Sequence, residues 1–403
     1  MVEQVSQSGN RRRLFRRPLR MAALALAVLA VFFLPVGWVP YIVRTLSPFV
    51  GLTSSICTRT VSITALLSLP ILLLILRRKR WFCQRLCPVG LICEGCGKLG
   101  GKKSRRSIKW CPALGRWGAI GTLAAAAVGF PLVLALDPIA ILFAAINAAG
   151  QPGTWAVGLA LAPLLLIGLI SIPFPHLWCG RFCPLGGFQD LLTDIRSLLV
   201  PREKGTVQKG GRRVDIMRRS FIGVALGTLI GKCGRGLPAN SPKRLRPPGA
   251  VEEQTFKSLC VRCGSCTRVC PTRILTPDIN PPDLPGCLAP RLSFDNLRGC
   301  VSDCKACSDV CPSGAISNFT IEEKPLQTIG RLVIDHEACL LFQDTECGFC
   351  LDLCPYKALR SEFSRETWTA SVVVAADQCN GCGLCLKACP TEEIVMRIQP
   401  VGS

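Results

Sequence analysis

Histidine is almost absent from this chain of 403 residues, which contains only His176 and His336. A helical bundle that holds haem b needs paired axial histidines, and haem c needs a Cys-x-x-Cys-His segment, which the sequence lacks. A P-loop is also missing, as is a Ser/His/Asp constellation. The sequence therefore predicts no haem, no bound nucleotide and no hydrolytic site in this chain.

Acidic residues are scarce in the first part of the chain. The formal net charge is +22, but residues 1–250 carry +27 and residues 251–403 carry −5. The basic side chains flank apolar segments and do not form one stripe with interleaved aromatic residues, so nucleic acid is a poor explanation of them. Two physically different halves are joined in one polypeptide.

The basic half contains long apolar stretches. A bilayer core of about 30 Å takes about 20 residues of helix, and four stretches reach that length. We expect transmembrane helices at 21–43, 55–76, 117–136 and 155–174. Basic residues gather before the first, between the second and third, and after the fourth, which predicts a cytoplasmic N-terminus. The expected fold is an α-helical membrane domain, multi-pass in the cell inner (cytoplasmic) membrane.

A fifth apolar stretch, from Met217 to Gly234, is short for a span. Arg218 and Arg219 followed by Ser-Phe-Ile are typical of a twin-arginine export signal, and a short final anchoring helix is the alternative. Both interpretations place the rest of the chain on the outer (periplasmic) side. A peripheral helix that leaves it inside stays open, because basic residues follow the segment directly.

Cysteine is abundant, with 26 residues, and the second half repeats one pattern. The four motifs, each ending in Cys-Pro, are Cys260, Cys263, Cys266 and Cys270; Cys300, Cys304, Cys307 and Cys311; Cys339, Cys347, Cys350 and Cys354; and Cys379, Cys382, Cys385 and Cys389. They begin 40, 39 and 40 residues apart. The second has one extra residue in its first gap, and the third has a seven-residue first gap that makes Cys339 the weakest candidate ligand.

This spacing is typical of iron–sulfur ligation. Three closely spaced cysteines hold one cluster, while the fourth, before proline, ligates the other cluster of a two-cluster ferredoxin. Zinc sites usually pair two short Cys-x-x-Cys knuckles, and a disulfide framework is the alternative for an exported domain. Four repeats of one spacing favour four 4Fe-4S clusters. Nested and sequential pairing of the motifs both remain open, with nested pairing preferred, and strands at 331–334 and 371–375 suit an α+β ferredoxin-like polyferredoxin domain.

The first half holds a second kind of cysteine repeat. "WFCQRLCPVG" begins at Trp81 and "WCGRFCPLGG" begins at Trp178. Residues four apart share a helix face, so each copy is expected to present two thiols. The four cysteines concerned are Cys83, Cys87, Cys179 and Cys183. Together they would hold one metal ion or a further cluster, whereas unligated, acylated thiols are the alternative.

Other polar candidates are less specific. Cys93 and Cys96 form a Cys-x-x-Cys pair that could join Cys111 in a second metal site. We interpret Cys57, Cys233 and Cys287 as lone cysteines. Asp137 is either a proton acceptor for quinol or a carboxylate at a helix end, the second being the simpler interpretation.

At this point the motifs resemble those of known families. The two Cys-x-x-x-Cys-Pro units are similar to those of NapH/NosR-type membrane polyferredoxins, and the segment from Arg218 onward is similar to NapG/MauM-type ferredoxins. The resemblance implies electron transfer from the quinol pool towards an extracytoplasmic oxidoreductase. The two ferredoxin clusters that usually follow the last span of the NapH type are missing, and Cys93 and Cys96 are additional.

These observations predict four segments and one main function. The segments are a basic cytoplasmic tail at 1–20, a membrane domain at 21–200, a basic linker with the twin-arginine-like segment at 201–250 and a ferredoxin domain at 251–403. We expect electron transfer from quinol or another redox donor to a redox partner protein with a basic docking patch. Whether the chain is itself a quinol dehydrogenase subunit stays open. Maturation or redox regulation of a neighbouring metalloenzyme is the rival, and a zinc scaffold is a third option.

Overall fold

The computed structural model describes most of the chain. The described residues are 47–60, 63–100, 112–148, 154–175, 177–199, 209–236, 243–295, 298–365, 368–391 and 395–401, together with positions 18, 20–22, 24 and 25. The expected span at 21–43 falls almost wholly outside them, and so do Cys111 and His176. Two compact units are formed: residues 1–238, 257–263 and 312–314 make the first, and the remainder makes the second.

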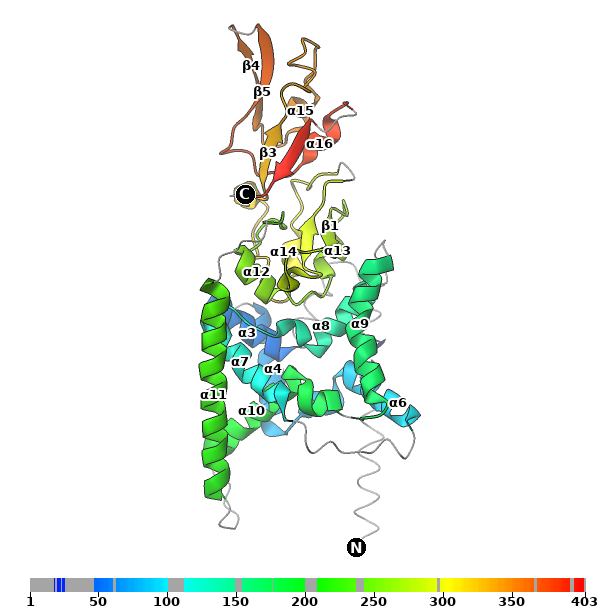
Figure 1. Cartoon of the computed structure of the whole chain (residues 1–403), viewed down its shortest axis with the longest axis vertical. Coiled ribbons are helices and arrows are strands. Elements are labelled where there is room, and N and C mark those ends of the chain that lie inside the picture. The colour runs from blue at the N-terminus through cyan, green and yellow to red at the C-terminus, as the bar shows by residue number, and fades with distance from the viewer. Residues whose placement is uncertain are drawn as a thin grey trace. The chain divides into compact units, whose positions relative to one another are not determined.

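The described part of the first unit is helical (Figure 1). Its elements are α3 (Pro48–Thr58), α4 (Ile63–Arg77), α5 (Trp81–Arg85), α6 (Pro88–Leu99), α7 (Leu114–Ala127), η2 (Leu134–Leu136), α8 (Pro138–Ala148), α9 (Thr154–Ser171), the π-helical turn η3 (Trp178–Phe182), α10 (Pro184–Leu199) and α11 (Lys209–Gly236). Proline begins α3, α6, α8 and α10, where its missing N–H costs nothing and its fixed φ suits a first helical turn.

The predicted membrane domain and multi-pass localisation are wrong. Among the helices that the structure describes, none combines the length and the apolar character needed to cross a bilayer. The apolar stretch at 55–76 is interrupted at Arg59, whose left-handed φ of 55° ends α3, so α4 has only 15 residues. That length spans about 22 Å, short of a core of about 30 Å.

One other expected span is broken in the same way, whereas the one at 155–174 forms a continuous but short helix. The stretch at 117–136 ends as a helix at Ala127, because Gly129 follows with a φ of 88°. Helix α9 has 18 residues and reaches about 27 Å. Helix α11 is longer, with 28 residues, but it begins with a charged segment. Apolar composition was read correctly from the sequence, whereas the continuity of the helices was not.

Small residues allow three helices of the first unit to pack closely. A Cβ atom on Gly227 of α11 would lie 2.6 Å from the carbonyl oxygen of Gly121 in α7. One on Gly187 of α10 would lie 2.3 Å from the carbonyl oxygen of Gly115, at the start of α7. Helix α7 therefore contacts both α10 and α11 backbone to backbone, and this fixes the start of α10 beside the second cysteine repeat.

The remaining elements are short. They are α12 (Glu253–Leu259), α13 (Ser265–Val269), β1 (Leu275–Pro277), η4 (Leu284–Gly286), β2 (Pro290–Leu292), α14 (Ala306–Asp309), η5 (Lys324–Leu326), β3 (Arg331–Ile334), α15 (Phe349–Leu353), β4 (Leu359–Ser364), β5 (Thr369–Val374), α16 (Leu384–Ala388) and β6 (Met396–Gln399). The strand predicted at 331–334 is confirmed as β3, and the one at 371–375 overlaps β5.

The described strands form three antiparallel pairs, β1 with β2, β3 with β6 and β4 with β5. In the second pair Arg331 faces Gln399 and Ile334 faces Met396, so β6 returns alongside a strand more than sixty residues earlier in the chain. Leu332, Leu359, Val372, Val395 and Met396 form a buried cluster between these strands and the short helices α15 and α16. Buried cysteines of the third and fourth motifs belong to the same cluster, so the hydrophobic core of this region is built around sulfur.

Candidate metal centres

One backbone conformation recurs at five of the Cys-Pro steps. The φ and ψ angles are −66° and 113° at Cys87, −64° and 118° at Cys183, −65° and 114° at Cys270, −73° and 109° at Cys354, and −67° and 121° at Cys389. Proline disfavours the α region for the residue before it, so each of these cysteines is extended. The last thiol of a motif is thereby separated from the short helix that carries the preceding cysteine, and it can join a different group of sulfurs.

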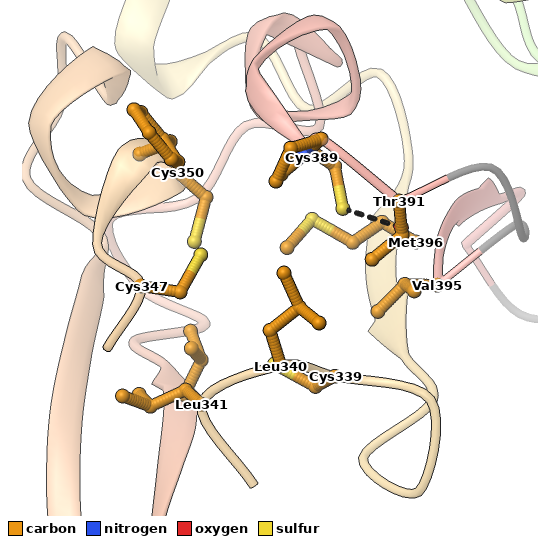
Figure 2. A pocket seen from close by; sticks show the side chains of 12 residues that line it. Cys339, Leu340, Leu341, Cys347, Cys350, Cys389, Thr391, Val395 and Met396 are labelled. Carbon is orange, nitrogen blue, oxygen red and sulfur yellow. Dashed lines mark hydrogen bonds between the residues drawn. The ribbon is translucent and has the colours of Figure 1, made fainter. Parts of the chain in front are cut away.

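Such an exchange occurs at the third motif. Cys339, Cys347 and Cys350 line a pocket together with Cys389, which belongs to the fourth motif (Figure 2). The sulfurs of Cys347, Cys350 and Cys389 point toward the same space in Figure 2. Apolar side chains close the cavity, and the Cys389 sulfur lies 3.0 Å from the Thr391 hydroxyl oxygen.

The fourth motif shows the reciprocal exchange. Cys379, Cys382 and Cys385 line a second pocket with Cys354 from the third motif. The third and fourth motifs therefore exchange their last cysteines with each other. Nested pairing, which would join the fourth motif to the first and the third to the second, is wrong for these two motifs, and sequential pairing describes them.

The second motif gathers in the same manner. Burial raises the pKa of Cys307 to about 12, and the neighbouring thiols of Cys300, Cys304 and Cys270 add to the effect. Cys270, the last cysteine of the first motif, therefore lies with the second motif. Cys311, which ends the second motif, accepts a hydrogen bond of 3.4 Å from the Ile316 amide.

The first motif is placed by two short helices. The chain leaves α12 at Leu259, so Cys260 follows that helix directly, and Cys263 lies in the loop before α13. Cys266 is within α13. The cysteines of this motif thus lie in a loop and in a single turn of helix, as they do in the three later motifs.

Burial sets the protonation of these thiols. It raises the pKa of Cys350 and Cys382 to about 11 and that of Cys385 to about 12, because an apolar surrounding disfavours the thiolate. Metal coordination deprotonates such a thiol outright, since the metal ion replaces the proton. Within the described ranges, no three His, Cys, Asp or Glu side chains surround a position for a single metal ion. Four cysteines that line one apolar pocket are the donor set of a 4Fe-4S cluster.

The paired units of the first half build matching turns. The Cys87 amide donates to the Phe82 carbonyl at 3.0 Å, and the Cys183 amide donates to the Trp178 carbonyl at 2.9 Å. Each turn ends in Cys-Pro, and a helix begins at the proline: α6 follows the first segment and α10 follows the second. We expected the two cysteines of each segment to occupy positions i and i+4 of one helix. This prediction is wrong, because the second cysteine lies in extended backbone beyond the helical turn.

The structure nevertheless brings the four sulfurs together. Burial raises the pKa of Cys183 well above its usual range, and the nearby thiols of Cys83 and Cys87 raise it further. The pKa of Cys179 is raised by its hydrogen bond with the Cys93 thiol, by burial, and by Cys183 and Cys87. The two units, almost a hundred residues apart in the chain, thus form one buried group of thiols.

Polar groups that the sequence did not reveal hold this group in place. Gln189 donates from Nε2 to the Cys83 sulfur at 3.0 Å and accepts from the Phe82 amide at 3.2 Å. The Arg80 guanidinium donates to Asp190 at 3.0 Å and to the Cys179 carbonyl at 3.4 Å. Both residues link the Cys-x-x-x-Cys-Pro segment at Trp81 to the one at Trp178. No spacing signal could have paired them, since their partners lie about a hundred residues away.

Cys93 lies next to this group of four thiols, because it is hydrogen-bonded to Cys179. Its hydrogen bond with Cys179 lowers its pKa to about 7, against the opposing effect of burial. Cys96, on the same helix α6, lies against α9, since a Cβ on Gly168 would be 3.6 Å from its sulfur. The expected partner Cys111 lies outside the described residues. Of the three cysteines interpreted as lone, Cys57 lies in α3, Cys233 is exposed on α11 and Cys287 follows η4.

Asp137 is the N-cap of helix α8. Its Oδ1 accepts from the Ile139 amide at 2.9 Å, and its Oδ2 accepts from the Ser47 hydroxyl at 2.7 Å. The side chain is fully buried, and this burial raises its pKa to about 6 despite the hydrogen bonds. The carboxylate thus caps the start of α8 and ties it to the start of α3, and it is a buried helix cap and not the carboxylate at the end of a membrane span that we expected.

Family models for iron–sulfur proteins match most of these cysteines. A model described as a 4Fe-4S dicluster domain matches residues 299–358 and 345–393, and one described as a 4Fe-4S binding domain matches 254–276. Another 4Fe-4S binding domain model matches 59–107 and 155–203, which contain the two Cys-x-x-x-Cys-Pro units. No solved structure matches the chain.

Three curated relatives are described as ferredoxin-type proteins. The ferredoxin-type protein NapG of Escherichia coli is 35% identical over 212 residues, which cover 48% of this chain and 87% of NapG. The methylamine utilization ferredoxin-type protein MauM of Methylobacillus flagellatus is 30% identical over 217 residues, covering 49% of this chain and 88% of MauM. The ferredoxin-type protein NapF of Escherichia coli is 32% identical over 153 residues, covering 37% of this chain and 82% of NapF. This chain is an iron–sulfur electron-transfer protein and belongs to the NapG/MauM family of ferredoxin-type proteins.

Proposed function

We propose that this protein conducts electrons through four 4Fe-4S clusters, one for each cysteine motif at 260–389. The exchange of Cys354 and Cys389 between the third and fourth motifs is the observation that carries this proposal. A shared pair of sites keeps two clusters close, as in two-cluster ferredoxins. The same exchange, at Cys270, supports a second pair formed by the first and second motifs.

The contacts between sites support a definite order of transfer. The Cys300 amide of the second motif donates to the Cys382 carbonyl of the fourth at 2.7 Å. Cys350 of the third motif is among the thiols that raise the pKa of Cys385 in the fourth, after burial and the fourth motif's own cysteines. We therefore propose the order first, second, fourth, third, which differs from the order of the motifs in the sequence.

A fifth centre is proposed at Cys83, Cys87, Cys179 and Cys183. The match of a 4Fe-4S binding domain to both segments that contain them supports it, as does their burial as one group. The likeness of these units to NapH/NosR-type proteins is kept as part of this proposal. Cys93 is an additional ligand candidate because it contacts Cys179, whereas Cys96 and Cys111 have no such support.

The donor and acceptor are proposed from the chemistry of the relay. Quinol or another redox donor would reduce the clusters, and an oxidoreductase would accept the electrons. The net charge of −5 at residues 251–403, more negative once clusters are bound, supports an acceptor with a basic docking patch. Mixing the anaerobic protein with a soluble quinol and following cluster reduction would test the donor, and clusters that never equilibrate with quinol would exclude it.

The cluster exchange can be tested through iron content. Four clusters require about sixteen iron atoms, and a fifth adds about four. Cys350→Ala with Cys389→Ala removes two ligands of one proposed cluster, so about four iron atoms should be lost and the EPR signals of the other clusters should remain. Cys385→Ala with Cys389→Ala removes one ligand from each of two clusters and should perturb both.

Cys287→Ala is the matched control, because this cysteine lies in the same region but in none of the motifs. It should keep full iron content. Equal losses in the two double variants would contradict the exchange, and iron-free protein after anaerobic preparation would contradict the whole proposal.

A further inference from the structure

Lys324 is the largest charged side chain that the described structure buries completely. It begins the short helix η5 and has 0% exposure. Its ammonium donates hydrogen bonds to the backbone carbonyls of Val301 and Cys304, and it also hydrogen-bonds the Cys300 sulfur. These three acceptors all belong to the loop of the second cysteine motif.

A buried ammonium is costly unless an opposite charge compensates it. Among the described residues, Lys324 has no carboxylate partner; the neighbouring ion pair is made by Lys305 with Asp309. Two carbonyl dipoles alone leave most of the charge uncompensated. The negative charge that remains within reach is that of the thiolates in the second motif, above all Cys300.

The cysteine groups of the third and fourth motifs lack this feature. The main influences on the pKa values of Cys350, Cys382 and Cys385 are burial, other cysteines and backbone N–H groups. At Cys300 the main influence is also burial, which raises the pKa, but Lys324 opposes it both as a charge and as a hydrogen-bond donor. A fixed positive charge therefore distinguishes the second site from the third and fourth.

Lys324 also lies at the junction of two sites. Its backbone carbonyl accepts from the Asn380 side chain at 3.5 Å, and the Asn380 side-chain oxygen accepts from the Cys382 amide at 3.1 Å. Cys382 in turn accepts from the Cys300 amide. The lysine is thus built into the contact through which the second and fourth motifs meet.

We propose that Lys324 is a tuning residue that raises the reduction potential of the cluster held by Cys300, Cys304, Cys307 and Cys270. This inference rests on the proposed function. When that cluster takes up one electron from a donor, its net charge becomes one unit more negative, while no bond and no proton on the protein changes. The ammonium charge stabilises the reduced form more than the oxidised form, because the interaction grows with the negative charge of the cluster in a medium of low dielectric constant. Electrons are therefore held preferentially at the second site, at the junction of the relay.

The test uses the full-length protein with its clusters. Lys324→Met removes the charge at nearly constant length, Lys324→Gln removes the charge but keeps a donor, and Lys324→Arg keeps both. Lys305→Met is the matched control, because Lys305 lies within the same motif but is one-third exposed and ion-paired with Asp309 at 3.2 Å. Cluster potentials are read from redox titrations with dithionite, followed by EPR.

In both neutral variants, the ratio of reduced to oxidised form at a fixed solution potential should fall about tenfold for one cluster only. For a one-electron couple that change corresponds to about 59 mV. The arginine variant and Lys305→Met should keep the native titration. Unchanged potentials in neutral variants with full iron content would overturn the proposal, and so would an equal shift in Lys305→Met.

A second measurement does not depend on whether the variants fold. Protein labelled with ¹⁵N-lysine and partly reduced should show a weak nitrogen coupling in pulsed EPR of the first cluster to be reduced, and Lys305→Met should retain it. Absence of any lysine coupling would overturn the role of Lys324 even with all clusters present. Loss of iron from the native protein would instead overturn the proposed function, so the two failures are distinguishable.

Discussion

Asp137→Asn should remove a pH dependence from the stability of the first unit. The Asp137 carboxyl is fully buried, and burial raises its pKa to about 6 from an unfolded value near 3.8. The folded state therefore binds the proton more tightly than the unfolded state does. Stability from this group is fully present below the unfolded pKa and is lost as the pH rises through about 6.

The magnitude follows from the two pKa values. Between pH 7.5 and pH 5, the protonated carboxyl should add about 1.4 kcal/mol to the free energy of unfolding, a tenfold change in the unfolding equilibrium. The asparagine variant keeps an oxygen for the Ile139 amide and cannot titrate, so its stability should lack this component. The difference between native and variant protein cancels the contributions of all other titrating groups.

Urea unfolding followed by circular dichroism at pH 5, 6 and 7.5, with iron content checked at each pH, measures the effect. Ser47→Ala is a useful companion, because it removes the hydrogen bond to Oδ2 and should raise the pKa of Asp137 further. A native protein that gains no stability over the variant between pH 7.5 and pH 5 would refute the reasoning. A gain in the opposite direction would show that the folded state prefers the ionised carboxylate.

Three further outcomes are expected. Gly227→Val should lower the free energy of unfolding by about 1–3 kcal/mol or more, because its Cβ would lie 2.6 Å from the Gly121 carbonyl oxygen. Gly158→Ala on α9 is the control: no atom lies within 4 Å of its Cβ, so it should stabilise the protein by up to about 1 kcal/mol. Thermal unfolding compares the two variants, and equal effects would contradict the close packing of α7 on α11. Gln189→Leu should cost about 1–3 kcal/mol, because the buried Phe82 amide loses its acceptor, and a variant with the native midpoint of chemical denaturation would contradict this role. Arg80→Met should weaken iron binding at the two Cys-x-x-x-Cys-Pro segments, because it removes the hydrogen bonds to Asp190 and to the Cys179 carbonyl. Lys79→Met is the control and should retain the native iron content, because the Lys79 side chain is mostly exposed. Identical iron contents in the two variants would contradict this role of Arg80.

The ferredoxin motifs can be recognised in the sequence because ligand spacing is a local property. Cys382 and Cys385 need only a turn and a helix start to lie together, and the strand at 331–334 follows from its β-branched and aliphatic residues. Pairing of the motifs was not predictable in this way. The spacing indicates that the fourth cysteine of a motif binds the cluster of another motif. Which motif that is depends on the pairing of β6 with β3, a contact between distant parts of the chain.

The first half was predicted less well, for a different physical reason. Hydropathy averages over a window, whereas a helix ends at a single residue such as Arg59 or Gly129. Gly129, followed by Pro131, is a helix-stop signal that a hydropathy window averages away, whereas no glycine or proline marks the break at Arg59. Gln189 and Arg80 were missed because a buried polar side chain is informative only once its partner is known.

The reciprocal lining of the last two cavities has a consequence for biosynthesis. The cavity of the third motif has its four thiols only once residue 389 has left the ribosome, because Cys389 completes it, and the cavity of the fourth motif has its four thiols only once residue 385 has done so. A truncated chain that ends between the third and fourth motifs would thus lack both sites at once. Delivery of inorganic cofactor to this region must wait for a nearly complete polypeptide, and the two sites would be filled together in the final stage of maturation.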